Sequence, residues 1–145
     1  MFVEIDHIGI VAATWEDAKR VFVDQLGLVP DEARSPLPDG VYFAPERTHN
    51  YFIKVGLGKT RVEVLIPADT TSGTARFLAR NGPGLHHIGY ACDDVAIEAD
   101  RLEEAGLRRI DLGPVADARR LAAAFFHPKS MNSILTELVP VYRER

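Results

Sequence analysis

Residues 5–9 read IDHIG and residues 86–90 read HHIGY, so the same His-Ile-Gly triplet occurs early in each half of the chain. Each triplet lies in a short apolar run that contains β-branched residues, which is the pattern of a β-strand. The triplets put His7 and His87 at matching points of two such strands. This match indicates that the chain is built from two copies of one structural plan.

The order of the elements around these two strands also repeats. In the first half, Thr14 begins a helix that Gly27 ends, because a hydroxyl residue caps a helix start and glycine favours a helix end. In the second half, a corresponding helix begins near Asp93 or Asp94 and ends at Gly106. The strand, helix and three further strands of each half are expected at 2–11, 14–26, 28–34, 50–55 and 60–66, and at 85–91, 94–105, 107–112, 119–126 and 133–139.

This order predicts an α+β fold made of two βαβββ modules. A chain of 145 residues is short enough for one domain, so we expect a single domain over residues 1–145. The first module is expected at about 1–70 and the second at about 84–141, with a linker helix at about 71–83. The segment NGPG ends the linker helix, because glycine and proline interrupt regular structure.

The composition is that of an ordinary globular protein, with 46% hydrophobic and 26% charged residues. The net charge of −4 argues against nucleic acid or a membrane surface as the main partner. Cys92 is the only cysteine, which fits a reducing compartment. The first residues, MFVEIDHIGI, lack the basic start of a signal peptide, and no apolar run approaches the roughly 20 residues of a membrane span. We therefore expect a soluble cytoplasmic protein.

A glutamate in the last strand of each half accompanies the matched histidines. Glu63 in RVEVLIP and Glu137 in LTELVP lie on the strand face opposite to that of their adjacent residues. A single histidine in an apolar strand is usually a packed core residue, but the same two residue types at matching places in both halves indicate a common site. Two nitrogen and two oxygen donors suit a divalent ion such as Zn²⁺, Ni²⁺, Co²⁺ or Mn²⁺. His7, Glu63, His87 and Glu137 are thus the candidate metal ligands.

Four segments carry a resemblance to a known family: IDHIGI, VEVLIP, FLARNGPGLHHIGY and FFHPKSMNSILTEL. They resemble the vicinal oxygen chelate superfamily, which includes glyoxalases, bleomycin-resistance proteins and dioxygenases, and within it most closely the methylmalonyl-CoA epimerases. The resemblance implies a cup-shaped, mostly antiparallel sheet around a metal site. It also implies the same four ligands, a catalytic acid–base role for Glu137, and a homodimer.

For the activity, the resemblance implies proton removal and return beside the carbonyl of a thioester, with an acyl-CoA as the small-molecule substrate. A metal ion would stabilise the enolate that forms. The sequence departs from the epimerase pattern at two positions. Phe43 stands where related epimerases carry a second acid–base glutamate, and Ala122 stands where they carry an arginine. The second acid–base residue of this chain is therefore left open.

Three alternatives remain open within the superfamily. The first is a glyoxalase I-like isomerase or lyase that acts on a glutathione hemithioacetal, which the loss of the epimerase glutamate at Phe43 favours. The second is a ring-cleaving dioxygenase, which needs only one carboxylate beside two histidines, so Glu63 argues against it. The third is a drug-binding protein without catalysis, a class that generally lacks the four ligands.

Overall fold

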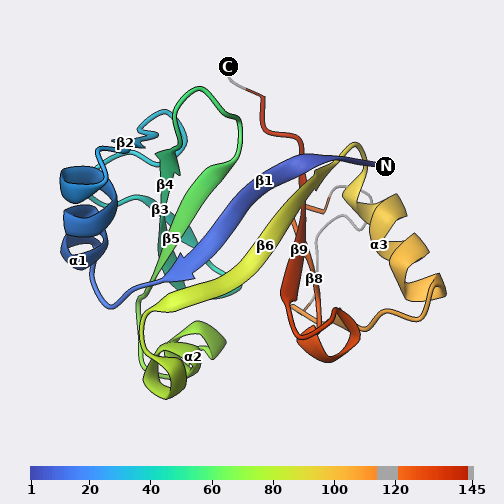
Figure 1. The fold of residues 1–145 in the computed structure, drawn as a ribbon. Helices are drawn as coiled ribbons and strands as arrows, with labels where there is room; N and C mark the ends of the chain where they lie inside the picture. The colour runs from blue at the N-terminus through green and yellow to red at the C-terminus, as the bar shows by residue number, and fades with distance from the viewer. Residues whose placement is uncertain (114–120, 144–145) are drawn as a thin grey trace. The chain divides into compact units, whose positions relative to one another are not determined.

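The computed structural model describes residues 1–113 and 121–143, and Figure 1 shows the order of their strands and helices. The chain forms two compact units, one of residues 8–86 and the other of residues 1–7 together with those from His87 onward. Strands β1 (Phe2–Val11) and β6 (Gly84–Cys92) contribute residues to both units.

The 8–86 unit contains the later part of β1 and the remaining strands of the first module. Its strand order is β2-β4-β5-β1, with β3 paired to β4. The pairings of β4 with β2, β3 and β5 are antiparallel. The elements after β1 are α1 (Trp15–Lys19), the π-helix η1 (Arg20–Gln25), β2 (Val29–Pro30), β3 (Val41–Phe43), β4 (Thr48–Lys54), β5 (Arg61–Pro67) and α2 (Gly73–Asn81).

Strand β2 is much shorter than the strand predicted at 28–34. The backbone N–H of Asp31 still donates to the carbonyl of Phe52, at 2.8 Å, but the chain then turns, and the N–H of Ser35 donates back to the carbonyl of Asp31 at 2.9 Å. A hydrogen bond between residues four apart belongs to a turn, so the strand cannot continue. The turn leads into the additional strand β3, which the sequence pattern did not predict.

Helix α1 covers one face of this sheet. Thr14 caps the helix, because its hydroxyl accepts a hydrogen bond from the N–H of Asp17 at 3.1 Å. The ring of Trp15 stacks on that of Tyr51, with centroids 4.3 Å apart, and both pack in a core with Val64. Since neighbouring residues of a strand alternate in direction, Glu63 points to the opposite face.

The second unit has the same strand order in its own half. Its strands run β6-β9-β8-β7, just as the first half runs β1-β5-β4-β2. The pairing of β6 with β9 is parallel, whereas β9 with β8 and β8 with β7 are antiparallel. The elements after β6 are α3 (Val95–Glu104), β7 (Arg109–Ile110), β8 (Ala124–Phe126), the 3₁₀ helix η2 (Pro128–Ser130) and β9 (Leu135–Pro140).

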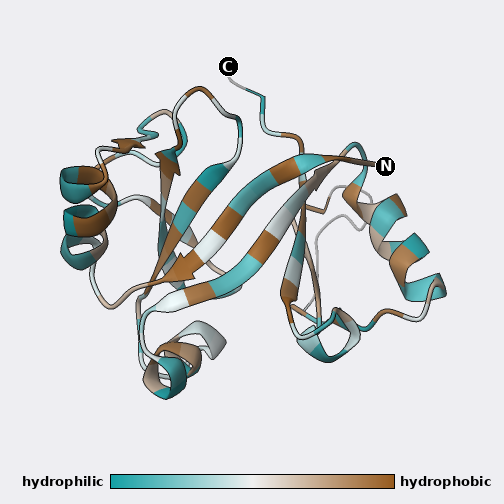
Figure 2. Ribbon diagram, viewed as in Figure 1, coloured by the Kyte–Doolittle hydropathy of each residue, from teal (hydrophilic) through white to brown (hydrophobic). Residues whose placement is uncertain are grey.

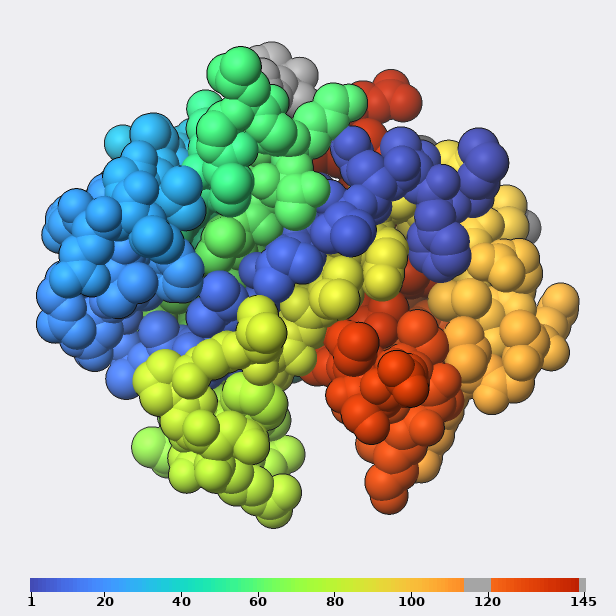
Figure 3. Space-filling view, viewed as in Figure 1, coloured from blue at the N-terminus to red at the C-terminus, as the bar shows by residue number. Residues whose placement is uncertain are grey.

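Helix α3 covers one face of this second set of strands. Ala99 and Leu102 of the helix pack in one core with Phe126 and Leu138 of the strands. The space-filling view shows the helix, in orange, beside the red segment that leads into β9 (Figure 3). Hydrophobic and hydrophilic residues alternate along β1 and β6 (Figure 2), as expected of strands with one face in the core. Glu137, beside Leu138, faces away from the helix.

The repeated strand order confirms the predicted pattern of two βαβββ modules. The linker helix predicted at about 71–83 is α2, and among the pairings described above all but one are antiparallel, as expected. The strand predicted at 119–126 is represented by β8, and residues 119 and 120 lie outside the described part of the chain. None of the helices in the described residues is long and apolar enough to span a membrane.

Candidate metal centre

Strand pairing places His87 and Glu137 on one face of the second unit. In the parallel pair of β6 and β9, Gly89 stands opposite Glu137, and in the antiparallel pair of β8 and β9, Phe125 does so. Residues opposite one another share a face, and so do residues two apart in one strand. His87 therefore lies on the same face as Glu137, away from α3, with its ring edge-to-face against Phe125.

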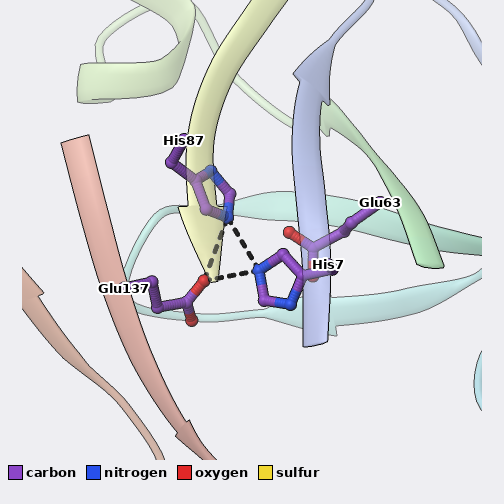
Figure 4. Close-up of side chains that lie close together, drawn as sticks. All are labelled: His7, Glu63, His87 and Glu137. Carbon is purple, nitrogen blue, oxygen red and sulfur yellow. Dashed lines mark hydrogen bonds and ion pairs between the residues drawn. The ribbon is translucent and has the colours of Figure 1, made fainter. Parts of the chain in front are cut away.

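Three predicted ligands from this unit meet at one point. The Nε2 atom of His7 lies 2.9 Å from Nε2 of His87, and Oε2 of Glu137 lies 2.8 Å from the first and 3.0 Å from the second. Figure 4 shows the three side chains pointing toward one another from β1, β6 and β9. All three residues are buried, with at most 6% of their surface exposed. Two imidazoles and a carboxylate without bulk water between them are the donor set of a metal site.

The carboxylate of Glu137 is held in its ionised form. Burial by itself raises the pKa of Glu137, because a charge is less stable away from water, but hydrogen bonds from His7 and His87 outweigh burial and lower the pKa. The group at the centre of the cluster is thus an anion. A metal cation bound by the two imidazoles would interact favourably with the same anion.

Asp6 orients the ring of His7. Its Oδ2 atom lies 2.7 Å from Nδ1 of His7, and both residues are buried. An ionised aspartate can only accept, so Nδ1 of His7 carries a proton, and Nε2 is the ring atom that could bind a metal ion in place of its hydrogen bond to Glu137. Ligand histidines in proteins usually have such a carboxylate or carbonyl behind them. The repeated pattern did not single out Asp6, although the Asp-His pair in IDHIG was a visible signal.

Gly89 provides the space in which the ring of His7 lies. A Cβ atom added at Gly89 would stand 2.2 Å from Cε1 of His7 and 2.4 Å from its Nε2. No side chain tolerates such distances, so only glycine fits at this position without moving the ring. The glycine of HHIGY thus has a role that its triplet did not reveal, namely the close approach of a side chain from another strand.

The spacing of the three donor atoms suits a single ion. Ligands at about 2.1 Å from one ion stand about 3.0 Å apart where they subtend a right angle. The observed separations of 2.8–3.0 Å are close to this value. His7, His87 and Glu137 therefore fit the divalent metal that the sequence predicted, and their nitrogen and oxygen donors suit Zn²⁺, Ni²⁺, Co²⁺ or Mn²⁺ alike.

Glu63, the fourth predicted ligand, belongs to the 8–86 unit. It lies on β5, opposite Phe52 of β4, and is buried with 5% of its surface exposed. Its strand flanks β1 in the first module as β9, with Glu137, flanks β6 in the second. Glu63 lies on the sheet face opposite to the apolar core that packs under α1.

Other polar side chains of the chain have structural roles. Arg61, a cation that an acyl-CoA phosphate could have used, instead donates from Nε to Oδ2 of the buried Asp31 at 2.8 Å. Glu46, the carboxylate nearest to Phe43 in the sequence, lies in a turn and accepts a hydrogen bond from Thr74 at 3.1 Å. Ala122, expected within the strand at 119–126, lies before β8, which begins at Ala124. The guanidinium of Arg61 is thus engaged in an ion pair within the fold.

The chain is similar to known proteins over most of its length. The profile of the Glyoxalase/Bleomycin resistance protein/Dioxygenase superfamily matches residues 6–125. An ethylmalonyl-CoA/methylmalonyl-CoA epimerase of Cereibacter sphaeroides is 32% identical over 143 residues, which cover 97% of this chain and 100% of the relative. The mitochondrial methylmalonyl-CoA epimerase of Dictyostelium discoideum is 29% identical over 136 residues, which cover 93% of this chain and 76% of that protein.

The fold is also similar to that of solved structures. A methylmalonyl-CoA epimerase in complex with methylmalonyl-CoA and NH₄⁺ superimposes with a TM-score of 0.80, at 24% identity, over 100% of this chain and 99% of the other. The epimerase of Mycobacterium tuberculosis gives a TM-score of 0.79 at 24% identity, over 97% of this chain and 90% of the other. This likeness confirms the predicted fold class.

Proposed function

Since the chain belongs to the glyoxalase/bleomycin resistance protein/dioxygenase superfamily, we propose that it is a metal-dependent epimerase-like enzyme that acts beside a thioester carbonyl. The observation that carries the proposal is the buried cluster of His7, His87 and Glu137. The 32% identity to an acyl-CoA epimerase, along the whole of that relative, supports an acyl-CoA as the substrate.

Four residues would hold the metal: His7, His87 and Glu137, with Glu63 as the fourth ligand. Support for Glu63 comes from its burial and from the repeated strand order, which gives it the place in the first module that Glu137 has in the second. A buried carboxylate costs several kcal/mol unless a cation or hydrogen bonds compensate it. A shared ion would satisfy both glutamates in the same way.

The chemistry divides between the ion and the chain. A divalent ion supplies Lewis-acid polarisation of the carbonyl next to the reacting carbon. Glu137, held ionised in the resting cluster, would exchange the proton on one face of that carbon. Inversion needs a second acid–base group on the opposite face, which is left open. Asp6 keeps Nε2 of His7 available as a ligand, and Phe125 packs against the ring of His87, so that the ligand rings are fixed.

A glyoxalase-like reaction on a glutathione hemithioacetal is the second candidate. It is favoured by the absence of a second carboxylate where epimerases have one, since Phe43 occupies that place in β3. The metal chemistry would be the same, and only the substrate would differ. A homodimer and a cytoplasmic location stay predictions from the sequence and the resemblance.

Solvent-deuterium exchange tests the proposal. The purified protein, loaded with Co²⁺, Zn²⁺, Ni²⁺ or Mn²⁺ in turn, is incubated with methylmalonyl-CoA in D₂O, and label at the α-carbon is measured by mass spectrometry. We expect exchange by the wild type, loss of at least about 100-fold in Glu137→Gln, and no loss in the control Glu104→Gln, whose side chain is exposed. No exchange by the wild type with any ion would refute the epimerase assignment, and isomerisation of the methylglyoxal–glutathione adduct would then favour the second candidate.

A further inference from the structure

A buried polar pair, Thr48 and Asn50, lies on the sheet face that carries Glu63. In the antiparallel pairing of β4 with β5, Phe52 stands opposite Glu63 and Asn50 stands opposite Leu65. Opposite residues share a face, and so do residues two apart in a strand, so Asn50 is a diagonal neighbour of Glu63. Its side chain is within reach of a ligand bound at that glutamate.

The hydroxyl of Thr48 fixes the orientation of the Asn50 amide. Thr48 is completely buried, and its Oγ1 donates to Oδ1 of Asn50 at 2.6 Å. With the amide turned over, the hydroxyl would lose this acceptor, and a buried hydroxyl without an acceptor costs about 1–3 kcal/mol. The oxygen of Asn50 therefore faces Thr48, and its Nδ2 group points away from it.

The Nδ2 group of Asn50 is a donor without an acceptor. Asn50 is only 6% exposed, and no described residue accepts a hydrogen bond from this nitrogen. Within residues 1–113 and 121–143, every side-chain nitrogen or oxygen that is closed to solvent has a partner. Nδ2 must therefore be open to solvent, although most of the side chain is buried. A buried residue with its oxygen fixed and its N–H groups accessible is preorganised to bind an oxygen atom.

On β3 and β4 this face carries no carboxylate, and Lys54 is its one ionisable side chain. Its positions on β3 are Val41 and Phe43, which stand opposite Asn50 and Thr48. The remaining positions on β4 are Phe52 and Lys54. An amide cannot take a proton from carbon, so Asn50 can bind and orient a substrate but cannot exchange its proton.

We propose that Asn50 is a substrate-binding residue whose Nδ2–H donates to an oxygen, carboxylate or carbonyl, of an acyl thioester held at Glu63. The proposal rests on the function proposed above. It assigns Asn50 to binding and not to proton transfer. The residue selects substrates that present an oxygen atom at this point, because a ligand without one would leave the donor unpaired.

Binding without turnover tests this role. Dissociation constants for methylmalonyl-CoA and propionyl-CoA are measured by calorimetry on metal-loaded wild type, Asn50→Asp and Asn50→Ala. The aspartate keeps the size of the side chain and the acceptor for Thr48 but replaces the donor by a second oxygen. Asn81→Ala is the matched control, since Asn81 lies on α2 and donates to the carbonyl of Phe77. Metal content and circular dichroism verify that each variant is folded.

We expect Asn50→Asp to weaken methylmalonyl-CoA binding by about tenfold or more, the effect of losing a hydrogen bond to a charged acceptor. Asn50→Ala should weaken it similarly, and Asn81→Ala should not. Unchanged propionyl-CoA binding assigns the bond to the carboxylate, whereas a parallel loss assigns it to the thioester carbonyl. Wild-type affinity in a folded Asn50→Asp variant overturns the inference alone. A wild type that binds neither thioester overturns the proposed function itself.

Discussion

Replacing Gly89 by alanine tests the geometry of the metal centre most directly. The new Cβ atom would stand 2.2 Å from Cε1, 2.4 Å from Nε2 and 2.6 Å from Nδ1 of His7. Carbon atoms in proteins approach to about 3.5 Å, so the imidazole must move by about 1.3 Å. The ring cannot make this movement and keep Nε2 at 2.8 Å from Glu137 and 2.9 Å from His87.

Two effects of different size follow from this displacement. Metal–ligand distances tolerate a change of only about 0.2 Å, so His7 would be lost as a ligand and the affinity should fall by about 100-fold or more. The metal-free protein should lose about 1–3 kcal/mol of unfolding free energy, which is the usual cost of overpacking a buried site. In a His7→Ala background the clash is removed, and Gly89→Ala should then cost less than about 1 kcal/mol.

The assay combines metal competition against a chromophoric chelator with urea unfolding of the apo-proteins. Gly73→Ala is the matched control, because a Cβ there meets nothing closer than the Arg76 guanidinium, at 3.9 Å. Wild-type metal affinity in Gly89→Ala would refute the assignment of His7 as a ligand. An equal loss of stability in the presence and absence of the His7 ring would show that the clash lies elsewhere.

Three further predictions concern single groups. Asp6→Asn should lower metal affinity about tenfold or more by weakening the orientation of His7, as measured by the same competition assay; an unchanged affinity would contradict the role of Asp6. Burial raises the pKa of Asp31, but the hydrogen bond and the charge of Arg61 outweigh burial, and the pKa is lowered. The ion pair therefore contributes its full unfolding free energy above the unfolded pKa of about 3.9, and this contribution is lost as the pH falls below that value. Urea unfolding from pH 6 to pH 3 should show that loss, and Asp31→Asn should reduce it; equal slopes would exclude the pair as the cause. Burial raises the pKa of Cys92 to about 11, so iodoacetamide at pH 8 should label it only in the unfolded protein, as mass spectrometry would show.

Much of the candidate site could be predicted from local patterns. The alternation of apolar residues around Glu63 and Glu137 showed that both carboxylates point away from the helix-covered face, because side chains of a strand alternate with a period of two. The repeated triplet linked His7 with His87. His7, His87 and Glu137 meet as predicted, since equivalent strands occupy equivalent places in the two modules.

The strand boundaries were harder to predict where turns compete with pairing. The strand expected at 28–34 ends after Pro30, because hydrogen bonds to the carbonyl of Asp31 close a turn. The ion pair of Arg61 with Asp31 could not be predicted, because the two residues are far apart in the sequence. Local composition cannot reveal which charge a distant segment brings to a strand.

The order of the elements, the chemical types of the candidate ligands and the strand face of each can be inferred from the sequence alone. These properties depend on the alternation of a strand and on the donor atoms of individual residues. Two features emerge only from the folded chain: Gly89 makes room for the ring of His7, and Asn50 is a diagonal neighbour of Glu63. Both depend on strand register and on close approach between segments far apart in the chain, which the pairing of the sheet establishes and no local pattern records.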